Sequence, residues 1–247
     1  MNQTSPVAKK ALPSPTVNTL AIDVGGSGLK ATVVDPNGTL LCDRVRIDTP
    51  VGSPPDAIVA LLVELVRELP TYDRVAVGFP GMVRHGVVLT APNLGHEGWS
   101  GYALAAALQK ELRRPVRVAN DADVQGLGVI RGQGVEMVVT LGTGFGTALC
   151  EDGRLCPHLE ISQQPFRKGE TYDQQLGNAA RKQVGQKKWQ KRVLKAIANL
   201  ATLTHFDHLY IGGGNARKLD CKLPANVTIV DNVAGLSGGV GLFAQPE

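Results

Sequence analysis

The sequence contains one local pattern twice: a strand, a glycine-rich turn and a second strand. The first copy runs from Val17 to Asp35 around the turn GGSG, and the second runs from Met137 to Glu151 around the turn GTGFG. Two halves that open in the same way indicate a duplicated architecture. Such a duplication predicts a ligand crevice between the two halves.

The elements between and after these copies predict an α/β fold. Periodicity and turn signals indicate a third strand over residues 39–47, a helix over 54–69 and a short buried strand over 73–78. In the second half, residues 174–181 and 188–204 show helical spacing. Strands that alternate with covering helices are typical of a mixed sheet with helical cover.

The domain boundaries follow from the same pattern. Residues 1–16 are polar and contain three prolines, so we expect a disordered tail. Residues 17–119 are predicted to form an N-terminal α/β domain, and residues 120–247 a C-terminal one. A helix of small residues near 235–243 closes the chain and is a candidate to pack back on the N-terminal domain.

Composition argues against several classes of protein. The chain has no run of about 18 apolar residues and no apolar N-terminal segment of the secretory type, so neither a membrane span nor a signal peptide is predicted. Its four cysteines form no C-x-x-C pair, which argues against a zinc site and against a disulfide framework. A cytoplasmic protein with reduced thiols is therefore expected.

Asp121 lies between an apolar run, residues 115–119, and a helical pattern, residues 122–130. A carboxylate at the carboxyl end of a strand and the mouth of a helix can face a ligand in a crevice. The alternative is structural, because an Asn or Asp at this place is commonly a helix N-cap. Three glycine-rich turns surround this one carboxylate, and together they suggest phosphate handling with one acid or base.

These turns lie in the segments DVGGSGLK and TLGTGFG and after the apolar run LYI. Glycine lets the backbone bend so that its N–H groups converge on a phosphate, and Asp23 could hold the water shell of a metal ion. The structural alternative is two hairpin turns and a helix start, and the P-loop pattern is absent. The candidate phosphate-binding residues are Asp23, Gly25, Gly26, Ser27, Gly28, Lys30, Thr140, Gly142, Thr143, Gly144, Gly213 and Gly214.

Taken together, the motifs resemble those of the ROK sugar kinases and, within them, the polyphosphate glucokinases. The resemblance is carried by AIDVGGSGLKATVVD, VGFPGMV, VVLTAPNL, VANDADVQGLG, VVTLGTGFGTAL, LYIGGGNARKL and the basic run KKWQKRV. It implies a duplicated actin-like (ribonuclease-H-like) ATPase fold, with two domains and a cleft between them. It implies phosphoryl transfer to the 6-hydroxyl of glucose with Mg²⁺, from polyphosphate or ATP, by a homodimer. The family's cysteine-rich zinc motif is missing, so no zinc is expected.

Site residues follow from the resemblance by position, and Asp121 corresponds to the catalytic base. The residues implied to bind the sugar are Gly81, Asn93, Asn120, Asp121, Glu160 and Gln163. Glu160 begins the counterpart of the family's E-x-G-H sugar motif, but here Ser162 and Gln163 replace its Gly and His. An amide can donate and accept hydrogen bonds but cannot be charged. His158 comes two residues too early for this motif and is interpreted as a loop residue.

A basic stretch follows the second half's glycine turn, with no acidic residue from Arg181 to Phe206. On a helix several of its cations share one face, with spacing i, i+3, i+4 and i+7. The structural alternative is a solvated helix face, and the functional interpretation is a track for a polyanion such as polyphosphate. Nucleic acid is not predicted, because no nucleic-acid motif is present. The predicted track consists of Arg181, Lys182, Lys187, Lys188, Lys191, Arg192 and Lys195.

The sequence thus predicts a polyphosphate-dependent glucokinase of the ROK type, with Asp121 as general base. Two alternatives stay open. One is a kinase for another hexose, such as mannose or N-acetylmannosamine. The other is a non-catalytic sugar- or polyphosphate-binding protein, because Gln163 replaces the family's histidine. ROK repressors carry an N-terminal DNA-binding motif, and none is expected here because only residues 1–16 precede the first strand.

Overall fold

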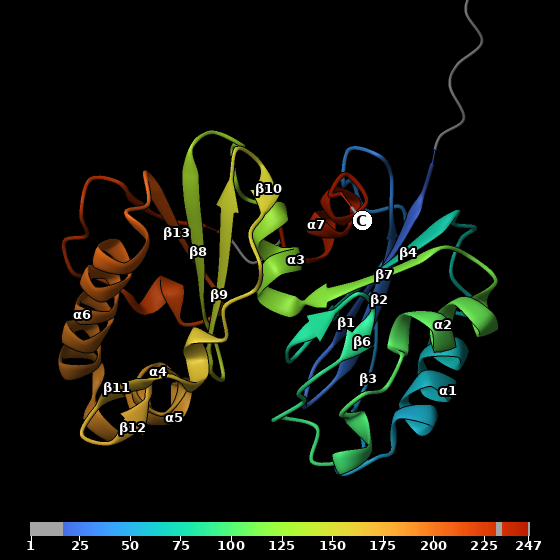
Figure 1. Cartoon of the computed structure of the whole chain (residues 1–247), viewed down its shortest axis with the longest axis horizontal. Helices are drawn as coiled ribbons and strands as arrows, with labels where there is room; N and C mark the ends of the chain where they lie inside the picture. The colour runs from blue at the N-terminus through green and yellow to red at the C-terminus, as the bar shows by residue number, and fades with distance from the viewer. Residues whose placement is uncertain (1–16, 231–233, 247) are drawn as a thin grey trace, which may run out of the picture.

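The computed structural model of the chain describes residues 17–230 and 234–246. It has two α/β lobes, each built on a five-stranded sheet, with the helices α3 (Asp121–Leu127) and α7 (Ala234–Leu242) between them (Figure 1). Residues 17–120 are called the N-terminal lobe below, and residues 135–230 the C-terminal lobe. The predicted disordered tail, residues 1–16, lies outside the described residues.

The N-terminal sheet has the strand order β3-β2-β1-β4-β7. Strands β1, β2 and β3 pair antiparallel, whereas β1, β4 and β7 pair parallel. The parallel strands therefore end together at one edge of the sheet, which is where α/β proteins bind ligands. The strands are β1 (Thr19–Val24), β2 (Leu29–Val34), β3 (Val45–Ile47), β4 (Arg74–Phe79) and β7 (Val116–Asn120).

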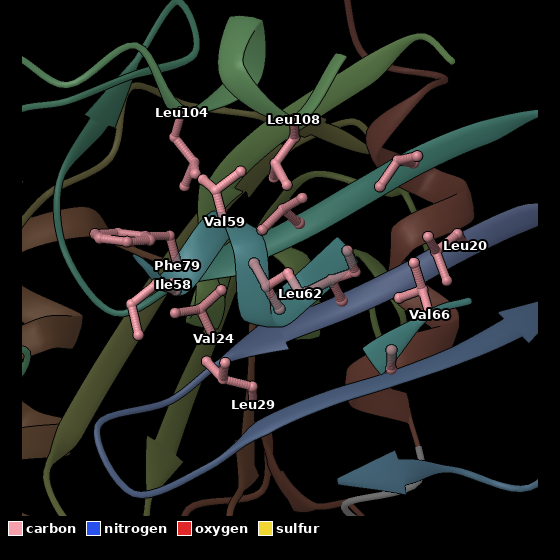
Figure 2. Packing of buried hydrophobic residues seen from close by; sticks show 14 of the residues in the cluster. Leu20, Val24, Leu29, Ile58, Val59, Leu62, Val66, Phe79, Leu104 and Leu108 are labelled. Atoms are coloured by element: carbon pink, nitrogen blue, oxygen red, sulfur yellow. The ribbon is translucent and has the colours of Figure 1, made fainter. Parts of the chain in front are cut away.

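Two helices, α1 (Pro55–Leu65) and α2 (Leu104–Leu112), pack on this sheet through apolar stripes. Ile58 and Leu62 of α1, like Leu104 and Leu108 of α2, repeat at i and i+4, so each pair faces the strands (Figure 2). Each such side chain contributes about 1.5–3 kcal/mol when fully buried. The lobe also contains β5 (Val83–Arg84), β6 (Val87–Val88) and the 3-10 helix η1 (Glu97–Trp99).

The C-terminal sheet has the order β10-β9-β8-β13-β14, with strands β8 (Val135–Leu141), β9 (Phe145–Glu151), β10 (Arg154–Leu155), β13 (His208–Gly212) and β14 (Val227–Ile229). The long helix α6 (Gln186–Thr204) packs its apolar face, including Trp189, Val193 and Ile197, against the same core as β8 and β13. The smaller elements are η2 (Ile161–Gln163), β11 (Pro165–Arg167), β12 (Glu170–Thr171), α4 (Tyr172–Leu176), α5 (Asn178–Val184) and η3 (Ala216–Lys218).

The helices α3 and α7 join the two lobes. Helix α3 contacts β4 of the N-terminal lobe and β8 and β9 of the C-terminal lobe, and α7 packs on α3, β1 and β4. Gly238 permits this contact, because a side chain there would collide with the Val124 carbonyl oxygen of α3. The C-terminal helix therefore lies against the N-terminal sheet and against the middle and end of α3, the helix that begins at Asp121.

Several elements differ from the sequence prediction. Of the strand expected over 39–47, only residues 45–47 form a strand, β3. Before β3, an isolated β-bridge joins Val34 and Leu40. The helix expected over 174–181 is two helices, α4 and α5, because Gly177 adopts an extended backbone conformation between them. Within the described ranges, none of the helices has the length and apolar character that crossing a membrane requires.

Candidate active site

A cavity of about 750 Å³ lies between the lobes. Its lining comes from the carboxyl ends of β1, β4 and β7, from the β8–β9 turn and from the loop before η2. Of the predicted sugar- and phosphate-binding residues, all line this cavity except Gly28. The structure therefore brings together residues that are spread over nearly 200 positions, from Asp23 to Gly214.

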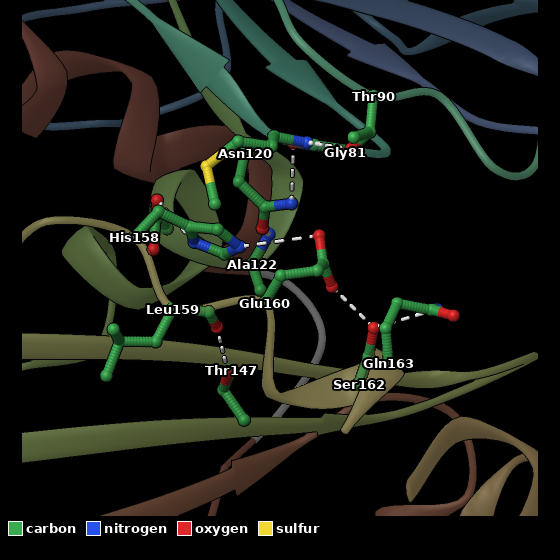
Figure 3. A network of polar contacts seen from close by, with 12 residues as sticks. Gly81, Thr90, Asn120, Ala122, Thr147, His158, Leu159, Glu160, Ser162 and Gln163 are labelled. Carbon is green, nitrogen blue, oxygen red and sulfur yellow. Dashed lines mark hydrogen bonds and ion pairs between the residues drawn. The ribbon is translucent and has the colours of Figure 1, made fainter. Parts of the chain in front are cut away.

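Asp121 is the first residue of α3 and follows β7 directly. Asn120 is the N-cap, because its side chain accepts a hydrogen bond from the Ala122 N–H at 2.8 Å. The Asn120 amide also donates to the Gly81 carbonyl oxygen at 3.1 Å, which ties the loop after β4 to the helix start (Figure 3). The capping role thus belongs to Asn120, and the Asp121 side chain lines the cavity.

The surroundings of Asp121 favour its protonated form. Burial raises the pKa of this carboxyl to about 7, and the nearby negative charges of Asp23, Asp123 and Glu160 add to the shift. One hydrogen bond from the Ala122 N–H opposes it. A carboxylate whose pKa lies near neutral pH is suited to general-base catalysis.

The first glycine turn is held in a closed shape at the cavity. The Gly25 N–H donates to the Gly28 carbonyl oxygen at 3.1 Å, and the Thr49 hydroxyl donates to the Gly25 carbonyl oxygen at 2.6 Å. Lys30 pairs with Asp23 at 2.9 Å. The Arg46 guanidinium covers Gly28, which explains why Gly28 does not line the cavity. Arg44, which the sequence analysis did not select, does line it.

The second and third turns pack against each other. The Asn215 side chain donates to the Gly142 carbonyl oxygen at 2.9 Å, and Gly213 lies at φ +90° against Leu141, which a residue with a side chain could not do. Asp173 of α4 accepts a hydrogen bond from the Phe145 N–H at 2.8 Å and also lines the cavity. Sequence reasoning missed Asp173, because no motif links it to the turn.

One wall of the cavity is a polar network around Glu160. The Ser162 hydroxyl donates to Glu160, and the Gln163 amide donates to the Ser162 hydroxyl at 3.1 Å (Figure 3). On the other side, Nδ1 of His158 lies 2.9 Å from Oδ2 of Asp123. The neighbouring His158 lowers the pKa of Glu160, and the hydrogen bond from Ser162 adds to this shift, whereas burial opposes it. This carboxylate is therefore ionised and can accept hydrogen bonds from sugar hydroxyls.

The structure places His158 differently from its interpretation as a simple loop residue. It lies in the loop between β10 and η2, but it is buried and lines the cavity. Burial alone would lower the pKa of His158, yet the hydrogen bond to Asp123 and the negative charges of Asp123 and Glu160 raise it to about 9. Sequence reasoning also missed Asp123, and the only signal was its position two residues after Asp121 in the run NDAD.

The predicted polyanion track lies outside the cavity lining. Lys187, Lys188 and Lys191 are exposed on α6, and no ion pair is formed by any track residue in the described part of the chain. The track nevertheless approaches the second glycine turn through α5. The Asn178 N–H donates to the Gly142 carbonyl oxygen at 3.1 Å, and Arg181 donates to the Asn178 side chain at 3.0 Å.

Over residues 17–230 and 234–246, no group of three or more His, Cys, Asp and Glu side chains is placed to hold a metal ion. Asp23 lines the cavity, and its charge is close enough to raise the pKa of Asp121. Two mutually repelling carboxylates at one cavity are the kind of ligand that a divalent cation arriving with phosphates can use.

The ROK family profile matches residues 19–157. The chain belongs to the ROK family. A polyphosphate glucokinase of Mycobacterium tuberculosis is 31% identical to this ROK protein over an alignment of 233 residues that covers 88% of this chain and 88% of that one. The crystal structure of an inorganic polyphosphate/ATP-glucomannokinase from Arthrobacter sp. strain KM has a TM-score of 0.82 and 29% identity, over 92% of this chain and 98% of that one.

The duplicated actin-like fold expected from the sequence is confirmed by these structural relatives. A ROK family transcriptional regulator, a homologue of E. coli MLC protein, has a TM-score of 0.71 at 17% identity, over 92% of this chain and 78% of that one. The same ROK architecture thus occurs in a protein named as a regulator. The fold alone does not separate a kinase from a binding protein, and the site has to make that distinction.

Proposed function

We propose that this protein is a polyphosphate-dependent glucokinase, which transfers a terminal phosphoryl group to the 6-hydroxyl of glucose. The observation that carries the proposal is the position of Asp121 at a cavity that glycine turns of both lobes also line. The 31% identity with a polyphosphate glucokinase over 88% of the chain supports the same reaction. A protein that only bound sugar would gain nothing from a carboxylate poised near neutral pH beside these turns.

Asp121 is the general base of the proposed reaction. A sugar hydroxyl is a weak nucleophile, and the Asp121 carboxylate accepts its proton as the new bond to phosphorus forms. Phosphoryl transfer otherwise depends on positioning and on neutralising the phosphate charge. Backbone N–H groups of the first and second glycine turns, together with Lys30, supply donors and charge on the side of the cavity where the donor phosphates would lie.

Mg²⁺ is the metal ion that suits this site. It is commonly bound through one or two carboxylates, water and substrate phosphates, and Asp23 would hold it through water. When bound, the ion supplies positive charge to the donor phosphates. The repulsion between Asp23 and Asp121 is the observation that favours a cation here.

Polyphosphate is the favoured donor, and ATP is the alternative. The second glycine turn contacts α5, and Arg181 on α5 begins the basic surface that continues along α6. A chain of phosphates that leaves the cavity beside Gly142 would meet the exposed Lys187, Lys188 and Lys191. A row of cations attracts a polyanion over several charges, whereas ATP would reach fewer of them.

Mannose is a second candidate acceptor. The Arthrobacter relative with a TM-score of 0.82 is named a glucomannokinase. In this chain the sugar wall contains Gln163 and Ser162 next to Glu160, so its hydrogen-bond donors differ from the family's E-x-G-H pattern. The homodimer implied by the resemblance stays a prediction, which a mass measurement in solution tests.

The experiment is a coupled assay for glucose 6-phosphate, with Mg²⁺ and either polyphosphate or ATP. Product with polyphosphate supports the proposal, and product with ATP alone would retain the kinase but refute its donor. If a panel of hexoses gave no product with either donor while glucose still raised the melting temperature, the protein would be a sugar-binding protein without catalysis.

A further inference from the structure

His158 has an unusual position for a loop histidine. Its side chain is 7% exposed, and the Asp123 carboxylate that contacts it is 6% exposed. The ring nevertheless belongs to the cavity lining. Its Nδ1 atom is engaged by Asp123, whereas Nε2 is buried without a hydrogen-bond partner among the described residues and lies 3.7 Å from Oε2 of Glu160. Figure 3 shows the ring pointing toward that carboxylate.

We propose that His158 is a sugar-binding residue of this site: its Nε2–H donates a hydrogen bond to a sugar hydroxyl that Glu160 also contacts, and Asp123 is the positioning residue that orients the ring. This inference rests on the proposed glucokinase function. It adds two residues to the acceptor site that no motif assigned.

The unpaired Nε2 atom argues for a ligand. A buried polar atom without a partner destabilises a folded protein, so a site that contains one commonly receives the partner from a bound molecule. A gap of 3.7 Å to Glu160 is too long for a hydrogen bond. A hydroxyl group placed beside both could accept from His158 and donate to Glu160, which would satisfy the two side chains at once.

Asp123 determines which atom of the ring faces the sugar. Its Oδ2 accepts from Nδ1 of His158, which leaves the opposite nitrogen toward the cavity. The two carboxylates next to the ring also hold a proton on Nε2, since they raise the pKa of His158 to about 9. A purely structural His–Asp pair would explain the contact with Asp123 but not the unpaired Nε2 atom at the cavity.

The nearby Gln163 does not provide the same contact. Its amide nitrogen donates to the Ser162 hydroxyl, and that hydroxyl donates to Oε1 of Glu160. Ser162 and Gln163 therefore brace one oxygen of the Glu160 carboxylate, while the other oxygen, Oε2, faces His158. The site has an imidazole on one side of Glu160 and a hydroxyl on the other.

The decisive variant is His158→Asn. Its amide can keep the contact with Asp123, because Nδ2 of asparagine takes the place of Nδ1, but it has no atom at the position of Nε2. With polyphosphate and Mg²⁺ saturating, we expect the KM for glucose to rise about 10- to 100-fold, as for loss of a hydrogen bond from a charged donor. The KM for polyphosphate should stay unchanged. A glucose KM within about twofold of the wild-type value, in a folded variant, would overturn the proposal.

The matched control is His85→Asn, the same change at an exposed histidine with φ +50° that does not line the cavity. It should leave both KM values as they are. Monodeoxy analogues of glucose then test the contact itself. For one analogue, the wild type should bind the analogue more weakly than glucose, whereas His158→Asn should bind the analogue and glucose equally well. Equal penalties in both proteins for every analogue would refute a direct contact.

A spectroscopic measurement on the wild-type chain covers the case in which His158→Asn does not fold. The nitrogen signals of His158 can be assigned by replacing the other histidines, His85, His96, His205 and His208, one at a time. Glucose should shift the His158 Nε2 signal, and an unmoved signal at saturating glucose would reject the inference. Asp123→Asn should lower the pKa of the His158 ring, because the asparagine amide lacks the negative charge that stabilises the protonated imidazole. An unchanged pKa of His158 would show that Asp123 does not set the state of the ring.

The outcomes separate this inference from the function on which it rests. If the wild type produces no glucose 6-phosphate with either donor, the proposed function fails. If the wild type is active and His158→Asn keeps its KM for glucose, only the role of His158 fails.

Discussion

The side-chain amide of Asn120 donates a hydrogen bond to the Gly81 carbonyl oxygen over 3.1 Å. The same side chain accepts from the Ala122 N–H at 2.8 Å, so one residue both caps α3 and holds the loop after β4. Asn120 is buried. Its removal would therefore leave the Gly81 carbonyl oxygen without the Asn120 donor, and the Ala122 N–H with Asp121 as its remaining side-chain acceptor.

Asn120→Ala should destabilise the protein and loosen the sugar site together. Loss of an N-cap costs about 1 kcal/mol, and an unsatisfied carbonyl adds about 1 kcal/mol, so the melting temperature should fall by roughly 4–8 °C. Asn120→Ser is the control, because serine still caps the helix but is too short to reach Gly81. Thermal unfolding measures both variants, and equal melting temperatures for Asn120→Ala and the wild type would contradict the capping role.

Asp121→Asn should remove most of the turnover while keeping the shape of the site. The amide oxygen can still accept from the Ala122 N–H, which Asp121 also contacts at 2.8 Å. Loss of a general base lowers kcat by about 10²- to 10⁴-fold. Glucose should still raise the melting temperature of the variant. A kcat within about tenfold of the wild type would reject Asp121 as the base.

The pKa of Asp121 predicts a pH dependence of activity. The base must be ionised, and burial with like charges raises its pKa to about 7, so kcat/KM for glucose should fall as the pH drops below about 7. On the acidic side of the profile, kcat/KM should fall almost tenfold for each pH unit. The residual activity of Asp121→Asn should not show this fall. A wild-type profile that stays flat down to pH ~5 would contradict a base with this pKa.

The raised pKa of Asp121 also affects the stability of the fold: rising pH favours activity but lowers stability. The folded protein holds the Asp121 proton more tightly than the unfolded chain does, so ionisation of Asp121 destabilises the fold as the pH rises from about 4 through about 7. Asp121→Asn should therefore melt at a higher temperature than the wild type at pH ~8, and the difference should vanish near pH ~4. A variant less stable than the wild type at both pH values would show that ionisation of Asp121 does not destabilise the fold.

The site residues that could be predicted from the sequence belong to short, continuous segments of the chain. Strand, glycine turn and strand are adjacent in the chain, so the turn residues from Gly25 to Lys30 could be selected from composition and order alone. Asp121 was visible for the same reason, since the end of a strand and the start of a helix meet there. The ROK resemblance, which the family match confirms, then linked these pieces to one cleft.

The parts that were missed depend on contacts between distant segments. His158 and Asp123 are 35 residues apart, and Asp173 meets the Phe145 N–H across 28 residues. Neither pair follows from periodicity, because each requires the path of a loop. The strand predicted over 39–47 is wrong in the residues before β3 for a related reason: Leu40 and Leu41 are exposed, so their apolar character reflects no buried strand face.

The basic surface of α6 offers the test of the donor. Lys187, Lys188 and Lys191 are exposed, and their side chains form no hydrogen bond or ion pair with the residues that the structure describes. By contrast, Arg192 donates to the Gln175 carbonyl oxygen, and Lys195 lies over the Phe166 ring. Replacing the first three with glutamine therefore removes charge and leaves packing intact. At about 0.5 kcal/mol for each exposed charge, the KM for polyphosphate should rise about tenfold.

The ATP KM should change much less, and the salt dependence of polyphosphate use should weaken, because fewer counterions are displaced. The control replaces Arg84, Lys110 and Arg113, which are exposed on the N-terminal lobe, with glutamine. Both triple variants lower the net charge by the same amount. Their comparison therefore shows whether polyphosphate binds to the cations of α6 or is attracted by the positive charge of the whole protein. Equal losses for both donors, or equal effects of the two triple variants, would mean that polyphosphate does not follow α6.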